Sequence, residues 1–151
     1  MYDPILNDLR RGAVADALAA AEALAAERPD DAQALRWLSA AQLQSGQAEA
    51  ALASIDRAIA LAPEDAELHL ARAGVLVGSR KPDEARAALD QATGLDPNQF
   101  GAYLSQAQLA LARGDLEEAE RVNRLAERVA PNHPQLAVVE GMVALQRGEA
   151  D

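Results

Sequence analysis

The stretch GQAEAALASIDRAIALAP, residues 46–63, decides the fold of this chain. Residues 48–61 within it are mostly Ala, Leu, Ile and Glu, and Ala, Leu and Glu are among the strongest helix formers. Glycine at Gly46 suits the left-handed turn that ends a preceding helix, and Pro63 cannot continue the helix that it follows. The stretch therefore predicts a turn, then a helix over 48–61, then a helix stop.

Three kinds of residue recur along the whole sequence with a period of 34 residues. The prolines that end the units are Pro29, Pro63, Pro97 and Pro131. An alanine precedes each proline by the same distance, at Ala17, Ala51, Ala85 and Ala119. A turn residue precedes each alanine, at Gly12, Gly46, Arg80, Gly114 and once more at Gly148. A fixed period over the whole chain predicts an array of repeated helix–turn–helix units.

About nine helices are expected, because every unit supplies two helical segments separated by a turn residue and ended by a proline. Carboxylates such as Asp31 and Asp65 follow the prolines and can cap the next helix. The expected bounds are 4–11, 14–28, 31–45, 48–61, 65–79, 82–95, 99–113, 116–129 and 133–147.

Composition excludes several classes of function. The chain has 151 residues, no Cys and a net charge of −10, so disulfides, thiolate metal sites and cysteine nucleophiles are excluded, and a nucleic-acid partner is disfavoured. The longest uncharged run, 97–112, contains Asn, Gln and Ser, so we expect no membrane span. Residues 1–12 carry Asp3 and Asp8 where a secretory signal needs a basic start, which favours a cytoplasmic location. Thirteen Arg to one Lys, with 37 Ala, are typical of a GC-rich bacterial genome.

The recurring positions, or columns, of these units resemble the tetratricopeptide repeat, whose 34-residue pattern combines small residues in both helices with a final proline. The small residues of the first helices are Ser39, Ala73, Ala107 and Gly141, and they face the column of Ala51. The resemblance covers the whole chain and implies an all-α fold, a right-handed α-solenoid of stacked antiparallel helix pairs. It implies one domain, 1–151, with repeats of about 1–31, 32–65, 66–99 and 100–133 and a partial repeat 134–151.

The sequence departs from the family pattern in two columns. The leucine of the first helix is Leu38 once and then Arg72, Gln106 and Glu140. These three residues could form a polar ladder along the stack, or they could simply be solvated, which we favour. The large aromatic residue of the second helix is replaced by Ala21, Ile55, Leu89 and Asn123.

The resemblance also implies a concave groove, lined by the first helices, that holds a peptide or helix of a partner protein. The positions that match this groove are Arg36, Trp37, Ala40, Gln44, Leu70, Ala71, Gly74, Leu104, Ser105, Gln108, Val138, Val139 and Met142. The alternative is that the apolar positions pack the repeats together, which we favour for Leu43, Val77 and Leu111. Trp37 can likewise be a partner contact or a core residue.

One known use of the family is a clamp of Lys, Asn and Arg side chains that grips a carboxyl terminus. The matching positions here are Gln33, Arg36, Trp37, Ala71, Gly101 and Ser105. They lack the paired cations and asparagines, so such a clamp is not expected.

No catalytic or metal site is predicted. His69 and His133 have no second ligand at helical spacing, and a metal site needs three or four converging donors, so both are expected to be structural. The acidic pairs Asp83–Glu84 and Glu117–Glu118 stand at the start of helices, where their negative charge interacts favourably with the helix dipole. We expect no cofactor and no enzymatic activity.

The last helix is apolar on more faces than a capping helix tolerates. Residues 148–151 also match 46–49, which open a second helix. These features predict that the chain is a fragment of a longer protein and that it forms a homodimer through helix 134–147.

The resulting functional hypothesis is a scaffold or adaptor that binds a partner polypeptide. The alternative is an N-terminal substrate-docking or regulatory module of a larger enzyme whose catalytic domain lies after residue 151.

Overall fold

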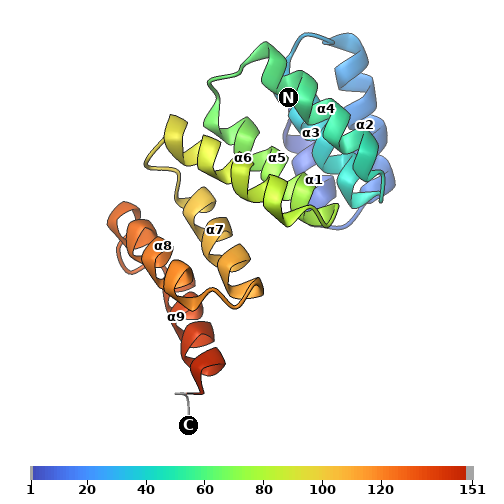
Figure 1. The fold of residues 1–151 in the computed structure, drawn as a ribbon. Coiled ribbons are helices and arrows are strands. Elements are labelled where there is room, and N and C mark those ends of the chain that lie inside the picture. The colour runs from blue at the N-terminus through green and yellow to red at the C-terminus, as the bar shows by residue number, and fades with distance from the viewer. Residues whose placement is uncertain (1, 149–151) are drawn as a thin grey trace. The chain divides into compact units, whose positions relative to one another are not determined.

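The computed structural model describes residues 2–148, and in these residues the regular secondary structure is all helical, with no strand. Every helix boundary lies within one residue of its sequence expectation, so the predicted all-α fold of repeated helix pairs is confirmed (Figure 1). The helices of the described residues are α1 (Asp3–Arg10), α2 (Val14–Glu27), α3 (Ala32–Gln44), α4 (Ala48–Leu61), α5 (Ala66–Gly78), α6 (Pro82–Leu95), α7 (Phe100–Ala112), α8 (Leu116–Val129) and α9 (Pro134–Arg147).

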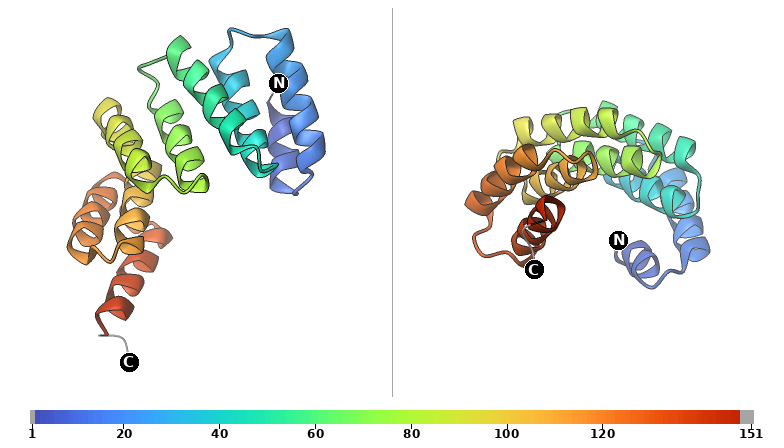
Figure 2. Two further views of the ribbon diagram at one scale, coloured as in Figure 1. Left: turned by 45° about the vertical axis from the view of Figure 1, so that its right-hand side comes forward. Right: turned by 60° about the horizontal axis from the view of Figure 1, so that its bottom comes forward.

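The chain forms two compact units, Met1–Ala88 and Leu89–Asp151, whose boundary falls inside α6. In the first unit, α1 with α2 and α3 with α4 form antiparallel pairs that lie side by side (Figure 2). In the second unit, α7 and α8 form such a pair, and α9 contacts both of them. Each unit therefore repeats the helix-pair packing expected from the sequence.

The turns between paired helices use the predicted residues. The backbone at Gly46 has a φ of +81°, a left-handed conformation that glycine adopts without steric cost. Arg80 occupies the same column with a φ of +59°, although a side chain disfavours this conformation. Asp31 and Asp65 cap α3 and α5 by accepting backbone N–H groups, as expected.

The core of each helix pair is built on small side chains. The Ser39 hydroxyl donates to the Ala51 carbonyl oxygen at 2.7 Å, so α3 and α4 cross in close contact. Ala73 and Ala107 are buried at the same place in their repeats, whereas Gly141 is exposed because no described helix covers that face of α9. Close packing of this kind leaves no room for a larger residue.

The proline at the end of a repeat presents a carbonyl oxygen that a side chain satisfies. The His69 Nε2 lies 2.8 Å from the Pro63 oxygen, and one repeat later the Tyr103 hydroxyl donates to the Pro97 oxygen at 3.0 Å. The Pro29 oxygen accepts instead from the Arg57 guanidinium at 3.1 Å. These contacts give His69 a structural role.

Among residues 2–148, no helix has the length and hydrophobicity needed to cross a bilayer.

Candidate functional site

The candidate site is a cleft between α3 and α5 in the first unit. These two helices contact each other, and the cleft between them encloses about 190 Å³. Five of the predicted groove residues line it together, and it is otherwise closed by three residues of the same helices. The lining residues are Arg36, Trp37, Ser39, Ala40, Leu43, Ala71, Gly74 and Val75.

Trp37 forms one wall of the cleft and also belongs to the protein interior. Its side chain is half-buried and packs against the cluster that contains Ile5 and Ala17. The ring of Tyr2 lies 6.4 Å from its ring, and the Arg36 guanidinium carbon lies 4.8 Å from the ring centre. Trp37 therefore serves as a core residue on one side and as an exposed apolar wall on the other.

The floor of the cleft is open at Gly74. A Cβ atom added to this residue would meet no other atom within 4 Å, and the residue is exposed. One turn further along α5, Val77 is 48% exposed, so the apolar surface continues toward the end of the helix. The Ser39 hydroxyl does not change this apolar character, because it already donates to the Ala51 carbonyl.

Charged groups lie at the end of the cleft where α3 and α5 begin. The Arg36 guanidinium forms an ion pair with Glu67 at 3.3 Å, while its Nε is buried without a partner. The Gln33 side-chain amide donates to Asp65 at 3.3 Å. The Tyr2 hydroxyl donates to the Asp31 carboxylate at 2.7 Å, and this bond lowers the pKa of Asp31 and raises the pKa of Tyr2.

The remaining predicted groove residues do not line this cleft. In the first unit, Leu70 is half-buried and Gln44 is exposed. In the second unit, Leu104 packs against the core and the Ser105 hydroxyl donates to a backbone oxygen of its own helix, while Gln108 is exposed.

Val139 was expected on the groove but is only 2% exposed, within the core cluster of the second unit. It packs there with residues such as Val122, which α8 contributes. Its neighbours Val138 and Met142 are 52% and 44% exposed. The register of α9 thus places every fourth residue from Val138 outward and turns Val139 inward. The expectation for Val139 was wrong.

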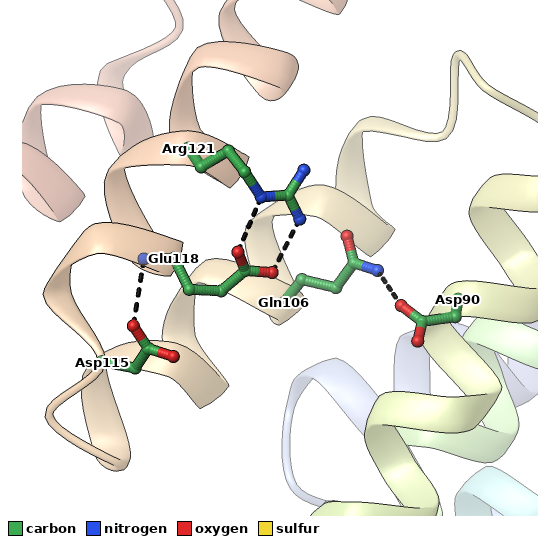
Figure 3. Close-up of polar contacts among 5 residues, drawn as sticks. All are labelled: Asp90, Gln106, Asp115, Glu118 and Arg121. Carbon is green, nitrogen blue, oxygen red and sulfur yellow. Dashed lines mark hydrogen bonds and ion pairs between the residues drawn. The ribbon is translucent and has the colours of Figure 1, made fainter.

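The less favoured alternative, a polar ladder along the stack, does not form, because Arg72 and Gln106 have other partners. Arg72 and Gln106 do not join each other; each bonds the aspartate sixteen residues before it on the preceding helix. The Arg72 Nε donates to Asp56 at 2.8 Å, and the Gln106 amide donates to Asp90 at 2.8 Å (Figure 3). These pairs link neighbouring repeats and are structural, so they add nothing to the cleft.

Acidic side chains at the start of α8 form a capping network. The Asp115 carboxylate accepts the backbone N–H of Glu118, and Glu118 binds the Arg121 guanidinium through two bonds of 2.6 and 2.7 Å (Figure 3). The hydrogen bonds that Arg121 donates to the Glu118 carboxylate raise the pKa of Arg121. Asp115 and Glu118 therefore stabilise the start of α8.

The imidazoles do not form a metal site in the described residues. The His133 Nδ1 accepts the backbone N–H of Gln135, so it caps α9, and its ring lies 4.4 Å from the ring of Phe100. Among residues 2–148, no group of three or more His, Asp or Glu side chains is placed to hold a metal ion.

A second apolar surface lies on α9. Val138, Met142 and Leu145 are exposed, the last by 66%, and they follow each other at helical spacing. Met142 and Leu145 stand 68 residues, or two periods, after Gly74 and Val77, whereas Val138 stands two periods after Leu70. Sequence reasoning missed that Ser39 and Val75 line the cleft, although the four-residue spacing of Ala71 and Val75 along α5 is a usable signal.

Comparison with known proteins identifies this arrangement. The family model described as Tetratricopeptide repeat matches residues 5–66 and 70–137. None of the curated proteins matches the chain. TTC0263, a thermophilic TPR protein of Thermus thermophilus, is 28% identical, with a TM-score of 0.85 over 93% of this chain and 78% of that one.

Two less similar structures contain bound peptides. The Yersinia enterocolitica type III secretion chaperone SycD, in complex with a peptide of the translocator YopD, is 22% identical, with a TM-score of 0.68 over 79% of this chain and 94% of that one. The second TPR domain of human RPAP3, in complex with the HSP70 peptide SGPTIEEVD, is 23% identical, with a TM-score of 0.63 over 70% of this chain and 88% of that one.

Proposed function

Because the chain belongs to the tetratricopeptide repeat family, we propose that it is a non-catalytic scaffold or adaptor that binds a segment of a partner polypeptide. The observation that supports this function is the open apolar cleft between α3 and α5, with Trp37 as its wall and Gly74 as its floor. A half-buried tryptophan in an apolar depression is typical of the energetic centre of a protein interface. Peptide complexes of the structurally similar SycD and RPAP3 domains lend support at the level of the fold.

The acidic tail of the peptide SGPTIEEVD is a poor model for the partner of this chain. The clamp positions expected from the family carry Gln33, Trp37 and Ala71 in place of cations and asparagines. Arg36 is the one cation among them, and it is already paired with Glu67. The proposed site thus recognises its partner chiefly through apolar contact.

Site-specific photo-cross-linking in cells tests this function. A photoreactive amino acid at position 74 should form covalent adducts with a partner polypeptide, which mass spectrometry identifies. The same amino acid at Ala60, exposed on α4 of the same unit, is the matched control and should give no such adduct. Equal adducts at both positions, or no polypeptide adduct at position 74, would refute the proposal.

A homodimer through helix 134–147 is a second candidate, favoured by the exposed stripe of Val138, Met142 and Leu145. Apolar side chains at successive turns of one helix face suit helix–helix association. Sedimentation equilibrium should show a mass that rises with protein concentration, and the variant Leu145→Asp should abolish that rise. A concentration-independent monomer mass for the unmodified chain would exclude the dimer.

The alternative function is an N-terminal docking module of a larger enzyme. Such a module would use the same cleft, but it would bind a substrate or regulator of that enzyme. The cytoplasmic location and the bacterial origin stay predictions.

A further inference from the structure

The size and charge of the α3–α5 cleft indicate which kind of partner segment it fits, an inference that rests on the function proposed above. We propose that the cleft receives one apolar side chain of a cationic amphipathic segment, whose Lys or Arg side chains lie against the carboxylates at the start of α5. Those carboxylates belong to Glu64, Asp65 and Glu67.

The volume of the cleft limits its occupant. Sites for small-molecule ligands measure about 300–1,000 Å³. The cleft encloses about 190 Å³, which is enough for one large apolar side chain and too little for a cofactor. The Ser39 hydroxyl donates to the Ala51 carbonyl oxygen, so its proton is not available to the occupant.

The walls of the cleft suit a helical or extended segment that lies on the surface. The Trp37 ring supplies a flat apolar contact, and the absence of a side chain at Gly74 lets the main chain of a partner come close. Val77, one turn further along α5, offers a second apolar contact for the same segment.

The charges near the cleft favour a cationic segment. Three carboxylates stand at the start of α5, and Arg36 contacts this group through Glu67. At the same end of the cleft, beside the start of α3, Asp31 lies near the cation Arg28 and the Arg57 guanidinium donates to the Pro29 carbonyl oxygen. The charge at the start of α3 is therefore closer to neutral than the charge at the start of α5.

The whole chain adds a net charge of −10, which attracts cationic partners over longer distances and repels acidic ones. A cationic segment therefore gains from the local and the overall charge together. An acidic segment of the same apolar pattern would be repelled by the local carboxylates and by the net charge of the chain.

Two synthetic peptides with identical leucine positions test the inference: three units of Leu-Lys-Lys-Leu and three units of Leu-Glu-Glu-Leu. Trp37 is the only tryptophan of the chain, so its fluorescence reports directly on the cleft. We expect the Leu/Lys peptide to change this emission on binding, with a Kd at least about tenfold lower than that of the Leu/Glu peptide.

Two pairs of variants separate the cleft from the general charge. A Cβ atom at Gly74 has open space around it, so Gly74→Leu places a bulky side chain at the cleft and should weaken binding of the Leu/Lys peptide about tenfold. Gly94→Leu, at another open helical glycine, should leave binding unchanged. Glu64→Lys should weaken binding about threefold more than Glu22→Lys, an exposed position on α2 with the same change in net charge.

Each contrary result overturns the inference. Suppose that the Leu/Glu peptide binds as tightly as the Leu/Lys peptide, and that Gly74→Leu weakens its binding. The charge argument is then wrong, while the proposed binding function stands. If the Leu/Lys peptide does not bind, or binds equally well to Gly74→Leu, the cleft does not take a cationic segment. The photo-cross-linking experiment at position 74 then tests the proposed binding function separately.

Discussion

Replacing Asn123 with leucine should stabilise the protein, because this asparagine occupies a core position without full hydrogen bonding. Its side chain is only 6% exposed. Its Nδ2 donates to the Leu136 carbonyl oxygen at 3.3 Å, but its Oδ1 is buried with no partner. The equivalent residues of the two preceding repeats, Ile55 and Leu89, are apolar and fully buried.

The size of the effect follows from three contributions. Removing the buried unpartnered oxygen should recover about 1–3 kcal/mol, while losing the one long hydrogen bond costs about 0.5–1.5 kcal/mol. The leucine methyl groups add burial worth about 0.8 kcal/mol per carbon, offset in part by strain if the site is tight. We expect Asn123→Leu to raise the free energy of unfolding by about 1–2 kcal/mol.

Urea denaturation followed by far-UV circular dichroism measures this change, since Trp37 lies in the other unit and does not report on α8. The midpoint should rise while the dependence on urea concentration stays the same. The reverse change at the matched position, Ile55→Asn, should cost about 3 kcal/mol or more. A lower midpoint for Asn123→Leu would refute the reasoning that the polar group is a net cost.

Three further predictions concern single contacts. Arg72→Ala should cost less than about 1 kcal/mol, because its bond to Asp56 is half-exposed, and a double-mutant cycle with Asp56→Ala measures the pair directly. Arg80→Gly should raise the melting temperature, since it relieves a left-handed backbone conformation that costs a side-chain residue about 1 kcal/mol. Tyr2→Phe should remove a pH-dependent stabilisation. Because the pKa of Asp31 is lowered in the fold, its contribution is present above the ordinary value of about 3.9 and is lost as the pH falls through the folded value. Because the pKa of Tyr2 is raised, its contribution is present below about 10 and is lost at higher pH. Unfolding of Tyr2→Phe and of the unmodified chain, each measured at acid and at alkaline pH, checks both contributions. An identical dependence of stability on pH in the two proteins would contradict the prediction.

The sequence predicted the helices because their ends depend on local chemistry. A proline after each second helix and a left-handed turn after each first helix act within a few residues, so a column such as Pro63 or Gly46 places a boundary closely. The burial of Ser39 and Ala73 followed from the same period, because a repeated small residue marks a repeated close crossing.

The site was predicted less completely because side-chain direction depends on the rotation of each helix. Val138 and Val139 are adjacent and chemically identical, yet one is exposed and the other is core. The partners of Arg72 and Gln106 likewise depend on which face meets the preceding helix. A single sequence carries little information on this angle when both faces of a helix are apolar.

The carbonyl oxygens at the repeat ends have a consequence for rearranging this chain. His69 and Tyr103 serve the proline just before their own helix, so each travels with its hairpin when a unit is moved. Arg57 instead reaches back to Pro29 from the second helix of its pair, so that contact depends on both α3 and α4. Deletions or duplications should be tolerated better when they keep 29–57 intact than when they cut between its ends.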